Sequence, residues 1–225
     1  MTSLADLWPA AGLRVAAGDL ELRWINDDLL VALADLASRG VHDPGVMPFL
    51  FPWTRGTPSQ VAQRVVTYQW DARSAVGPDR LLLELAVLRD GVPVGVQALG
   101  GSDVAVVRSV ETGSWLGLEH QGGGTGTRMR ALAVHLAFVG LGLREVTSTA
   151  FADNAASRAV SERVGYEPNG AGPVAREGVP VDQRRFRLTR ERWEGLRAAH
   201  RELLGDDVVL DGVARVREQA GLGGG

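Results

Sequence analysis

The sequence contains no cysteine and no lysine, although it is 225 residues long. Without cysteine, the chain forms no disulfide, has no thiolate nucleophile and offers no sulfur ligand to a metal. Without lysine, the P-loop type of nucleotide site is excluded, because that loop needs a lysine that reaches the phosphates. All 24 basic residues are therefore arginine. We attribute this bias to a GC-rich genome and draw no functional conclusion from it.

Long apolar runs and an excess of positive charge are missing as well. No apolar run approaches the length of about 18 residues that a membrane-spanning helix needs. Residues 1–6 lack the basic start and the apolar core of a secretory signal. The net charge of −3 gives no electrostatic case for nucleic-acid binding, and His42, His135 and His200 lack the spacing of metal ligands. We therefore expect a cytoplasmic protein without a metal, a membrane partner or a nucleic-acid partner.

The chain alternates between strand-like and helix-like segments, which indicates an α/β fold. The hydrophobic fraction of 45% allows a core of ordinary size. We assign residues 1–204 to a single domain and residues 205–225, which end in glycines, to a C-terminal tail. Periodicity and turn residues predict strands at 20–24, 80–89, 92–99, 104–118, 144–151 and 183–188, and a further strand that begins at 165–167. Periodicity and capping residues predict helices at 26–38, 128–140 and 190–204, and two more that begin at 57 and at 154.

The most informative segment is the glycine-rich stretch 121–127, which lies between a strand-like run and a helix-like run. Such a turn exposes backbone N–H groups at the positive end of a helix, where a phosphate or pyrophosphate binds. The dinucleotide fingerprint G-x-G-x-x-G is not satisfied, because Thr127 and Met129 stand where its third glycine is required. The loop is therefore predicted to bind a phosphate group without being either of the common nucleotide loops.

Two motifs give the chain a family resemblance. Gln121, Gly124 and Gly126 match Q/R-x-x-G-x-G/A, which resembles the acyl-CoA loop of the GCN5-related N-acetyltransferases (GNAT). Residues 154–166 are similar to the N-x-x-S-x-x-V-x-E-x-x-G-F/Y segment of the branch that modifies ribosomal-protein N-termini. The resemblance extends over roughly residues 18–190. It implies a largely antiparallel sheet that is splayed at its central strands and flanked by helices.

The resemblance also implies where an acyl-CoA binds. The loop amides and the helix dipole hold the pyrophosphate, and the edge of the preceding strand pairs with the pantetheine arm much as another strand does. The same edge supplies an N–H to the thioester oxygen. The implied cofactor-binding residues are Trp115, Leu116, Gly117, Gln121, Gly122, Gly123, Gly124, Thr125, Gly126, Thr127, Asn154, Ser157 and Arg163.

For the chemistry, the resemblance points to Ser157 and Glu111. Many members of the family use a tyrosine to protonate the departing thiolate, but Ser161 stands at that position here. In the ribosomal-type branch the serine of N-x-x-S takes this role, and here that serine is Ser157. The alternative is that Ser157 is an ordinary helix residue whose hydroxyl bonds to a nearby backbone carbonyl. Glu111 is the candidate general base or acceptor-binding carboxylate, and a solvated strand residue is its alternative.

The acceptor side is less well defined. Met47, Phe49 and Trp53 lie where the family builds its acceptor pocket, and they either line that pocket or pack beneath it. The implied function is transfer of an acetyl group from acetyl-CoA to a primary amine, which is a protein N-terminus, a lysine or a small molecule. Two alternatives stay open. One is succinyl-CoA as the donor, which an arginine or an amide near the acyl end would favour, and the other is a non-catalytic acyl-CoA sensor. The sequence does not identify the acceptor, and a homo-oligomer is compatible with it.

Overall fold

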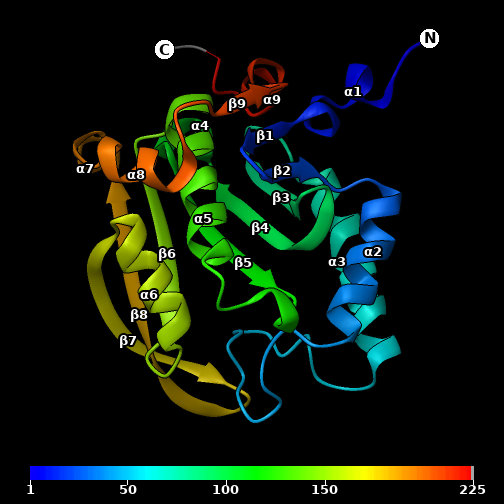
Figure 1. Cartoon of the computed structure of the whole chain (residues 1–225), viewed down its shortest axis with the longest axis vertical. Helices are drawn as coiled ribbons and strands as arrows, with labels where there is room; N and C mark the ends of the chain where they lie inside the picture. The colour runs from blue at the N-terminus through cyan, green and yellow to red at the C-terminus, as the bar shows by residue number, and fades with distance from the viewer. Residues whose placement is uncertain (224–225) are drawn as a thin grey trace.

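The computed structural model of the chain describes residues 1–223, and within them one nine-stranded sheet runs through the molecule (Figure 1). The strand order is β7-β8-β6-β5-β4-β3-β2-β1-β9. Neighbouring strands are antiparallel except for β5 and β6, which are parallel. The strands are β1 (Arg14–Ala17), β2 (Leu20–Trp24), β3 (Arg80–Arg89), β4 (Val92–Ser102), β5 (Ser109–Leu116), β6 (Glu145–Phe151), β7 (Glu167–Arg176), β8 (Val179–Thr189) and β9 (Val209–Asp211).

Helices pack against both faces of this sheet. They are α1 (Leu4–Leu7), η1 (Pro9–Gly12), α2 (Asp27–Ser38), α3 (Pro58–Ser74), α4 (Val104–Val107), η2 (Leu118–His120), α5 (Thr125–His135), η3 (Leu136–Gly140), α6 (Ala155–Val164), α7 (Arg190–Gly195), α8 (Arg197–Leu204) and α9 (Val213–Gln219). Helices α2 and α3 lie on one face, and α5 and α6 lie on the other (Figure 1). The mixed, mostly antiparallel α/β architecture expected from the sequence is therefore confirmed.

The two faces of the sheet bury two separate hydrophobic clusters. Along β3, Leu85 and Val87 point to the cluster that contains α5, whereas Ala86 and Leu88 point to the cluster under α2 and α3. This alternation follows from the two-residue period of a strand. It also fixes the direction of Glu84, which shares the face of Ala86 and therefore points toward α3.

Local signals place the helices and turns as expected. The Asn26 side chain accepts a hydrogen bond from the Leu29 N–H and begins α2, and a capping box between Thr57 and Gln60 begins α3. Residues 90–91 connect β3 to β4 with positive φ at both positions, which is the geometry of a two-residue hairpin turn. These elements depend on neighbouring residues alone, and their predictions are confirmed.

The expected strand over 104–118 needs a correction. Residues 104–107 form the short helix α4, and the strand begins only at Ser109. Asp103 and Arg108 adopt positive φ on either side of the helix, and Val104 between them is fully buried. The run of β-branched residues is typical of a strand, but here it forms a helical turn between β4 and β5 that buries Val104 against Gly101.

The segment that the sequence leaves as a C-terminal tail continues the domain in the structure. Strand β9 pairs with β1 and extends the sheet at that edge. Val216, Ala220 and Leu222 are fully buried in the cluster that contains α5. Residues 205–222 therefore belong to the folded unit. The expectation that this glycine-ended tail is frayed is therefore wrong for residues 205–222, and residues 224–225 lie outside the described residues.

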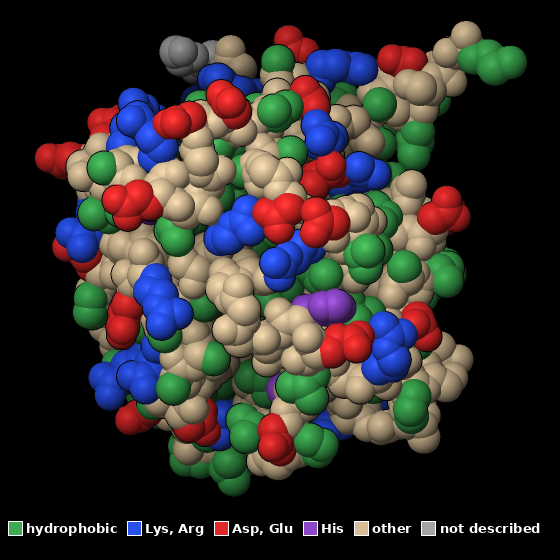
Figure 2. Space-filling view, in the orientation of Figure 1, with side chains coloured by type: hydrophobic (Ala, Val, Ile, Leu, Met, Phe, Trp, Pro, Cys, Tyr) green, Lys and Arg blue, Asp and Glu red, His purple; other side chains and the backbone are tan. Residues whose placement is uncertain are grey.

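The visible surface carries both signs of charge. Figure 2 shows acidic and basic side chains interspersed over this face, without one large basic area. Within residues 1–223, no helix is both long enough and apolar enough to cross a lipid bilayer.

Candidate active site

The parallel strands β5 and β6 diverge at the centre of the sheet. They pair with each other only up to Thr112 and Ser148. Beyond this point β5 stays paired with β4 as far as Leu116, and β6 stays paired with β8 as far as Phe151. Figure 1 shows the two strands separating there. The last residues of β5 therefore have a free backbone edge on the side of β6, which is the edge predicted for the pantetheine arm.

Arg130 of α5 joins the two diverging strands. Its guanidinium donates to the Ser114 hydroxyl of β5 at 3.0 Å, to the Ser148 hydroxyl of β6 at 2.9 Å and to the Gln97 side-chain oxygen at 3.4 Å. Arg130 is only 3% exposed. Within the described part of the chain it has no ion pair with a carboxylate, so a buried positive charge lies where the strands separate.

The partners of Arg130 make this place rich in hydrogen-bond donors. A guanidinium carries only donors, so the oxygen atoms of Ser114 and Ser148 must accept from it. The hydroxyl hydrogens of both serines then remain available to donate to another group. Sequence reasoning missed this arrangement, because residues from α5, β4, β5 and β6 meet only after the sheet has formed.

The glycine loop has the backbone geometry of an anion site. Gly122 and Gly124 adopt φ of +79° and +80°, which side chains other than glycine rarely tolerate. A Cβ atom at Gly122, Gly123 or Gly124 would meet no atom within 4 Å, so this side of the loop faces open space. Gly124 is the N-cap of α5, and no side chain caps the helix. The N–H groups of Thr125 and Gly126 therefore stay available to a ligand, whereas the Thr127 N–H donates to the Gly124 carbonyl oxygen at 3.1 Å.

One residue of the predicted loop motif has a structural role. The Gln121 amide donates to the carbonyl oxygens of Val41 at 2.7 Å and Leu116 at 3.0 Å, which braces the loop against the end of β5. At Gly126 a Cβ atom would lie 3.5 Å from a methyl group of Val160 of α6, which is an ordinary van der Waals contact, so packing against α6 does not itself require glycine here. The hydroxyl-bearing loop residues Thr125 and Thr127 are both buried.

The predicted pantetheine edge ends beside this loop. At Gly95 of β4 a Cβ atom would lie 2.2 Å from the carbonyl oxygen of Trp115, so glycine is needed for the close approach of the two strands. The Gly117 N–H donates to the Val94 carbonyl oxygen at 3.0 Å and is therefore used within the fold. Leu116 is the last residue of β5.

Helix α6 carries the second motif. The Asn154 side chain caps it by accepting from the Ser157 N–H at 3.0 Å. Because α5 and α6 each follow a parallel strand, both helices begin at the same end of the sheet. Ser157 is half-buried near that end, whereas Arg163 is exposed in the last turn. Ser161 is fully buried, and its hydroxyl has no partner within residues 1–223.

A groove of about 680 Å³ lies on the face of the sheet that α3 covers. It reaches Ser114 and Thr112 of β5, at the place where the strands diverge. The groove is a suitable place for an acceptor, because it ends beside the strand edge predicted for the acyl group. Its aromatic and acidic lining residues include Phe49, Phe51, Trp53, Tyr68, Glu84, Glu111 and Trp115.

The loop between α2 and α3 forms one end of the groove. Phe49 packs on Trp53 with ring centroids 5.0 Å apart, and Trp53 packs on Trp115 at 5.7 Å. Both Phe49 and Trp53 line the groove. Met47 does not line it. Met47 is 4% exposed, and its carbonyl oxygen accepts a hydrogen bond from Arg176 at 3.0 Å, so it packs beneath the loop.

Glu111 lies at the opening between the strands. Its side chain is exposed, lines the groove and accepts a hydrogen bond from the Thr149 hydroxyl of β6 at 2.8 Å. The contact extends from β5 to β6 across the divergence. It places a carboxylate on the groove side of the opening, where an amine would approach a thioester held at the strand edge.

Glu84 is a second carboxylate on the groove floor that sequence reasoning missed. Tyr68 donates to one of its oxygens at 2.7 Å, and the Gln69 amide lies 3.5 Å from the other. Burial raises the pKa of Glu84 to about 7, although these two hydrogen bonds act in the opposite direction. The available signal was a single acidic residue inside the apolar run 81–88.

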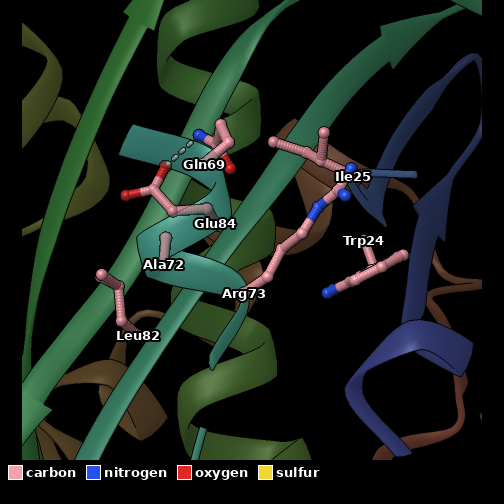
Figure 3. Close-up of a pocket in the computed structure, with 7 residues that line it drawn as sticks. All are labelled: Trp24, Ile25, Gln69, Ala72, Arg73, Leu82 and Glu84. Atoms are coloured by element: carbon pink, nitrogen blue, oxygen red, sulfur yellow. Dashed lines mark hydrogen bonds between the residues drawn. The ribbon is translucent and has the colours of Figure 1, made fainter. Parts of the chain in front are cut away.

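A small cavity lies next to Glu84 (Figure 3). Arg73 also lines it, but its guanidinium points toward Trp24 and Ile25 rather than toward the Glu84 carboxylate (Figure 3). Arg73 donates to Asp27 at 2.6 Å and stacks over the Trp24 ring at 5.1 Å. In the described part of the chain, the hydrogen-bond partners of Glu84 are therefore Tyr68 and Gln69 and not an arginine.

Metal ligands do not gather in this site. Within the described residues there is no group of three or more histidine, aspartate or glutamate side chains that is able to hold a metal ion.

Comparison with known proteins identifies the family. The profile of the acetyltransferase (GNAT) domain matches residues 19–167. Over 118 residues, the chain is 34% identical to YdaF of Bacillus subtilis, which carries a ribosomal N-acetyltransferase name. This match covers 50% of the present chain and 62% of YdaF, so the chain spans less than two thirds of that relative.

Solved structures share the fold. A GCN5-related N-acetyltransferase from Brucella melitensis matches with a TM-score of 0.67 and 22% identity, over 85% of each chain. RimJ of Mycobacterium smegmatis, described in complex with CoA-disulfide, matches with a TM-score of 0.61 and 22% identity, over 84% of this chain and 93% of its own. The sequence profile covers both motifs and the strands between which they lie, and the chain belongs to the GNAT acetyltransferase family.

Proposed function

We propose that this protein transfers an acetyl group from acetyl-CoA to a primary amine. The observation that carries the proposal is the meeting of the glycine loop, the free edge of β5 and the groove at one opening of the sheet. The loop presents unpaired backbone N–H groups to a pyrophosphate. The strand edge presents backbone groups to the pantetheine arm, and the groove leads an amine to the same opening.

In this proposal Glu111 and Ser157 divide the proton transfers. Glu111 removes a proton from the amine on the groove side, and the nitrogen then attacks the thioester carbonyl. When the carbon–sulfur bond breaks, Ser157 protonates the departing thiolate. Backbone N–H groups at the β5 edge stabilise the negative charge on the carbonyl oxygen.

The pKa of the acceptor amine determines how strongly the reaction depends on a general base. At pH 7 about 10–17% of an α-amine is neutral, compared with about 1 in 2,500 of a lysine side chain. A protein α-amine is the acceptor suggested by the relatives' names, since one matching structure is described as the ribosomal L7/L12 alpha-N-protein acetyltransferase RimL. A peptide with a free α-amine is therefore one of the acceptors to test.

The experiment combines binding with turnover. Calorimetry measures acetyl-CoA binding, and a thiol assay measures CoA release in the presence of a panel of peptides and small amines. Binding with amine-dependent thiol release supports the proposal. Binding without release for every amine indicates a non-catalytic acyl-CoA sensor, and absence of binding contradicts both functions.

The loop assignment predicts the effect of Gly124→Val. Valine at a position with φ of +80° strains the backbone, and its side chain extends into the space facing the loop. The Kd for CoA should rise at least about tenfold, which corresponds to about 1.4 kcal/mol. Ala11→Val, outside the site, serves as a control. Calorimetry measures the Kd, and unchanged affinity in a folded Gly124→Val protein would refute the loop assignment.

A second donor, succinyl-CoA, is favoured by Arg130. A guanidinium without a carboxylate partner among residues 1–223 and two serine hydroxyls with free hydrogens lie where the strands separate. A carboxylate at the end of the acyl group would give this buried charge its missing counter-ion. With acetyl-CoA the same donors would face only the carbonyl oxygen.

Arg130→Met tests the second donor. If the succinyl carboxylate binds at Arg130, the variant should lose at least about tenfold in kcat/KM with succinyl-CoA, because a hydrogen-bonded charge contributes about 1.5–3 kcal/mol. The loss with acetyl-CoA should be much smaller. Thiol release measures both donors, and thermal melting checks the fold. Equal losses with the two donors would leave Arg130 with a structural role and remove the case for succinyl-CoA.

A further inference from the structure

Glu84 is a nine-tenths buried carboxylate that forms no ion pair with any cation among residues 1–223. Its hydrogen-bond partners are the neutral groups of Tyr68 and Gln69, and it is 9% exposed. Burying a carboxylate without a counter-ion is unfavourable. Since Glu84 lines the open groove, a ligand in that groove has access to the charge.

None of the charged groups around Glu84 forms an ion pair with it within residues 1–223. From α3, one terminal nitrogen of Arg73 pairs with Asp27, while its other two guanidinium nitrogen atoms are buried without a hydrogen-bond partner. Arg64 donates to backbone carbonyl oxygens of the loop between α2 and α3. Arg80 of β3 lies 3.5 Å from Asp71. On β5 the facing titratable group is Glu111, which carries the same sign of charge. Tyr68 remains a neutral donor, because burial and the nearby carboxylate raise its pKa.

The floor between Glu84 and Glu111 carries almost no side chains. In the sheet register Glu84 lies opposite Ala98, which lies opposite Gly113. Two residues further along the strands, Gly100 lies opposite Glu111. The Leu82 side chain covers this glycine, because its methyl group would lie 3.0 Å from a Cβ atom there, so the open path crosses Ala98 and Gly113. At Gly113 the nearest atom to an added Cβ is the Ala98 methyl group at 4.0 Å. An extended ligand can therefore lie across β4 between the two carboxylates.

The register also gives the separation of the two acidic residues. They are two strands apart and two residues out of step, so their Cα atoms lie about 12 Å apart for ordinary strand spacings. Both side chains point to the same face of the sheet. Aromatic residues Tyr68 and Trp115 line the path, and aromatic rings accommodate both alkyl chains and cations.

We propose that the acceptor is a dication of the linear diamine type, with its reacting amine at Glu111 and its second ammonium group bound by Glu84 and Tyr68. The inference rests on the proposed acyltransferase function. Glu84 acts here as a specificity-determining residue that binds the distal ammonium group. The acylation itself takes place at the opening between β5 and β6, and Glu84 has no part in the bond changes.

The test compares linear α,ω-diamines of graded length with monoalkylamines of the same chain length. Thiol release with acetyl-CoA should give a kcat/KM that peaks at one diamine length, at least tenfold above the matched monoamine. In Glu84→Gln this ratio should fall at least tenfold, whereas Glu202→Gln, an exposed position on α8, should keep it. Ala98→Val, which places a larger side chain on the floor, should also lower the ratio.

A binding measurement separates this inference from the enzymatic function. At pH 7 the ammonium group should displace a proton from Glu84, so the calorimetric enthalpy of diamine binding should depend on the buffer's ionisation enthalpy. Glu84→Gln should remove that dependence. If no amine gives thiol release, the proposed acyltransferase function is refuted. The proton release measured by calorimetry still tests whether a diamine binds at Glu84. A diamine preference retained in Glu84→Gln, or equal use of monoamines by the unmodified protein, overturns the inference.

Discussion

Glu84→Gln should stabilise the ligand-free protein by about 3 kcal/mol at pH 8 and have almost no effect at pH 4.5. The reason is the pKa of Glu84, which burial raises from 4.5 to about 7. Above pH 7 the folded protein must keep a carboxylate in the groove floor, where no cation compensates it. Glutamine has nearly the same shape and retains hydrogen-bonding capacity toward Tyr68, but it carries no charge.

The sign follows from proton binding. Between pH 4.5 and about 7 the folded state holds a proton on Glu84 that the unfolded state has lost. The contribution of Glu84 to stability is therefore most favourable below pH 4.5, and it declines as the pH rises through the folded-state pKa. The advantage of the glutamine variant should grow over this window and stay constant above it.

Denaturant unfolding at a series of pH values measures the difference directly. Glu202→Gln is the control, because it removes the same charge from an exposed position of α8. Its stability difference should remain near zero throughout. If Glu84→Gln is less stable than the unmodified protein at pH 8, or if the stability difference does not change with pH, burial of the Glu84 carboxylate does not destabilise the folded protein.

Ser157→Ala should lower kcat for acyl transfer by roughly 100-fold, which is the usual scale of a general-acid contribution. Ser157 lies near the beginning of α6, where its N–H binds Asn154. Its hydroxyl makes no hydrogen bond within residues 1–223, so it is available to the departing thiolate. The alanine variant keeps the helix cap, and the Kd for CoA should change little.

Ser161→Ala is the matched control for this prediction. The two serines are four residues apart on α6, but the Ser161 hydroxyl is fully buried and unpartnered. Removing an unsatisfied buried hydroxyl costs little, so this variant should keep kcat. Stopped-flow or steady-state assays of thiol release measure kcat for both variants. A Ser157→Ala enzyme with kcat within a few-fold of the unmodified protein would assign Ser157 to packing, and the thiolate would then depart without its help.

Features that depend on adjacent residues were predictable from the sequence. The glycine loop, the cap at Asn154, the capping box at 57–60 and the turn at 90–91 each result from local backbone preferences. The same local motifs carried the family resemblance that the domain profile bears out. The assignments of Ser157, Glu111 and the cofactor-binding residues stay predictions for the experiments above.

Tertiary structure decided what depends on distant residues. Arg130 meets Gln97, Ser114 and Ser148 only because β5 and β6 diverge beneath α5. Glu84 becomes a groove carboxylate because α3 covers its face of the sheet.

The same reason explains the positions where sequence patterns failed. Residues 104–107 have a strand-like composition but fold as a helical turn between β4 and β5. Residues 205–222 have tail-like glycines, but 209–211 pair with β1 and Val216, Ala220 and Leu222 fill the core. The sequence by itself therefore determined the local elements, the glycine-rich loop and the family. Only long-range packing decided which charges are buried, because burial and missing counter-ions depend on contacts between segments that are far apart in the chain.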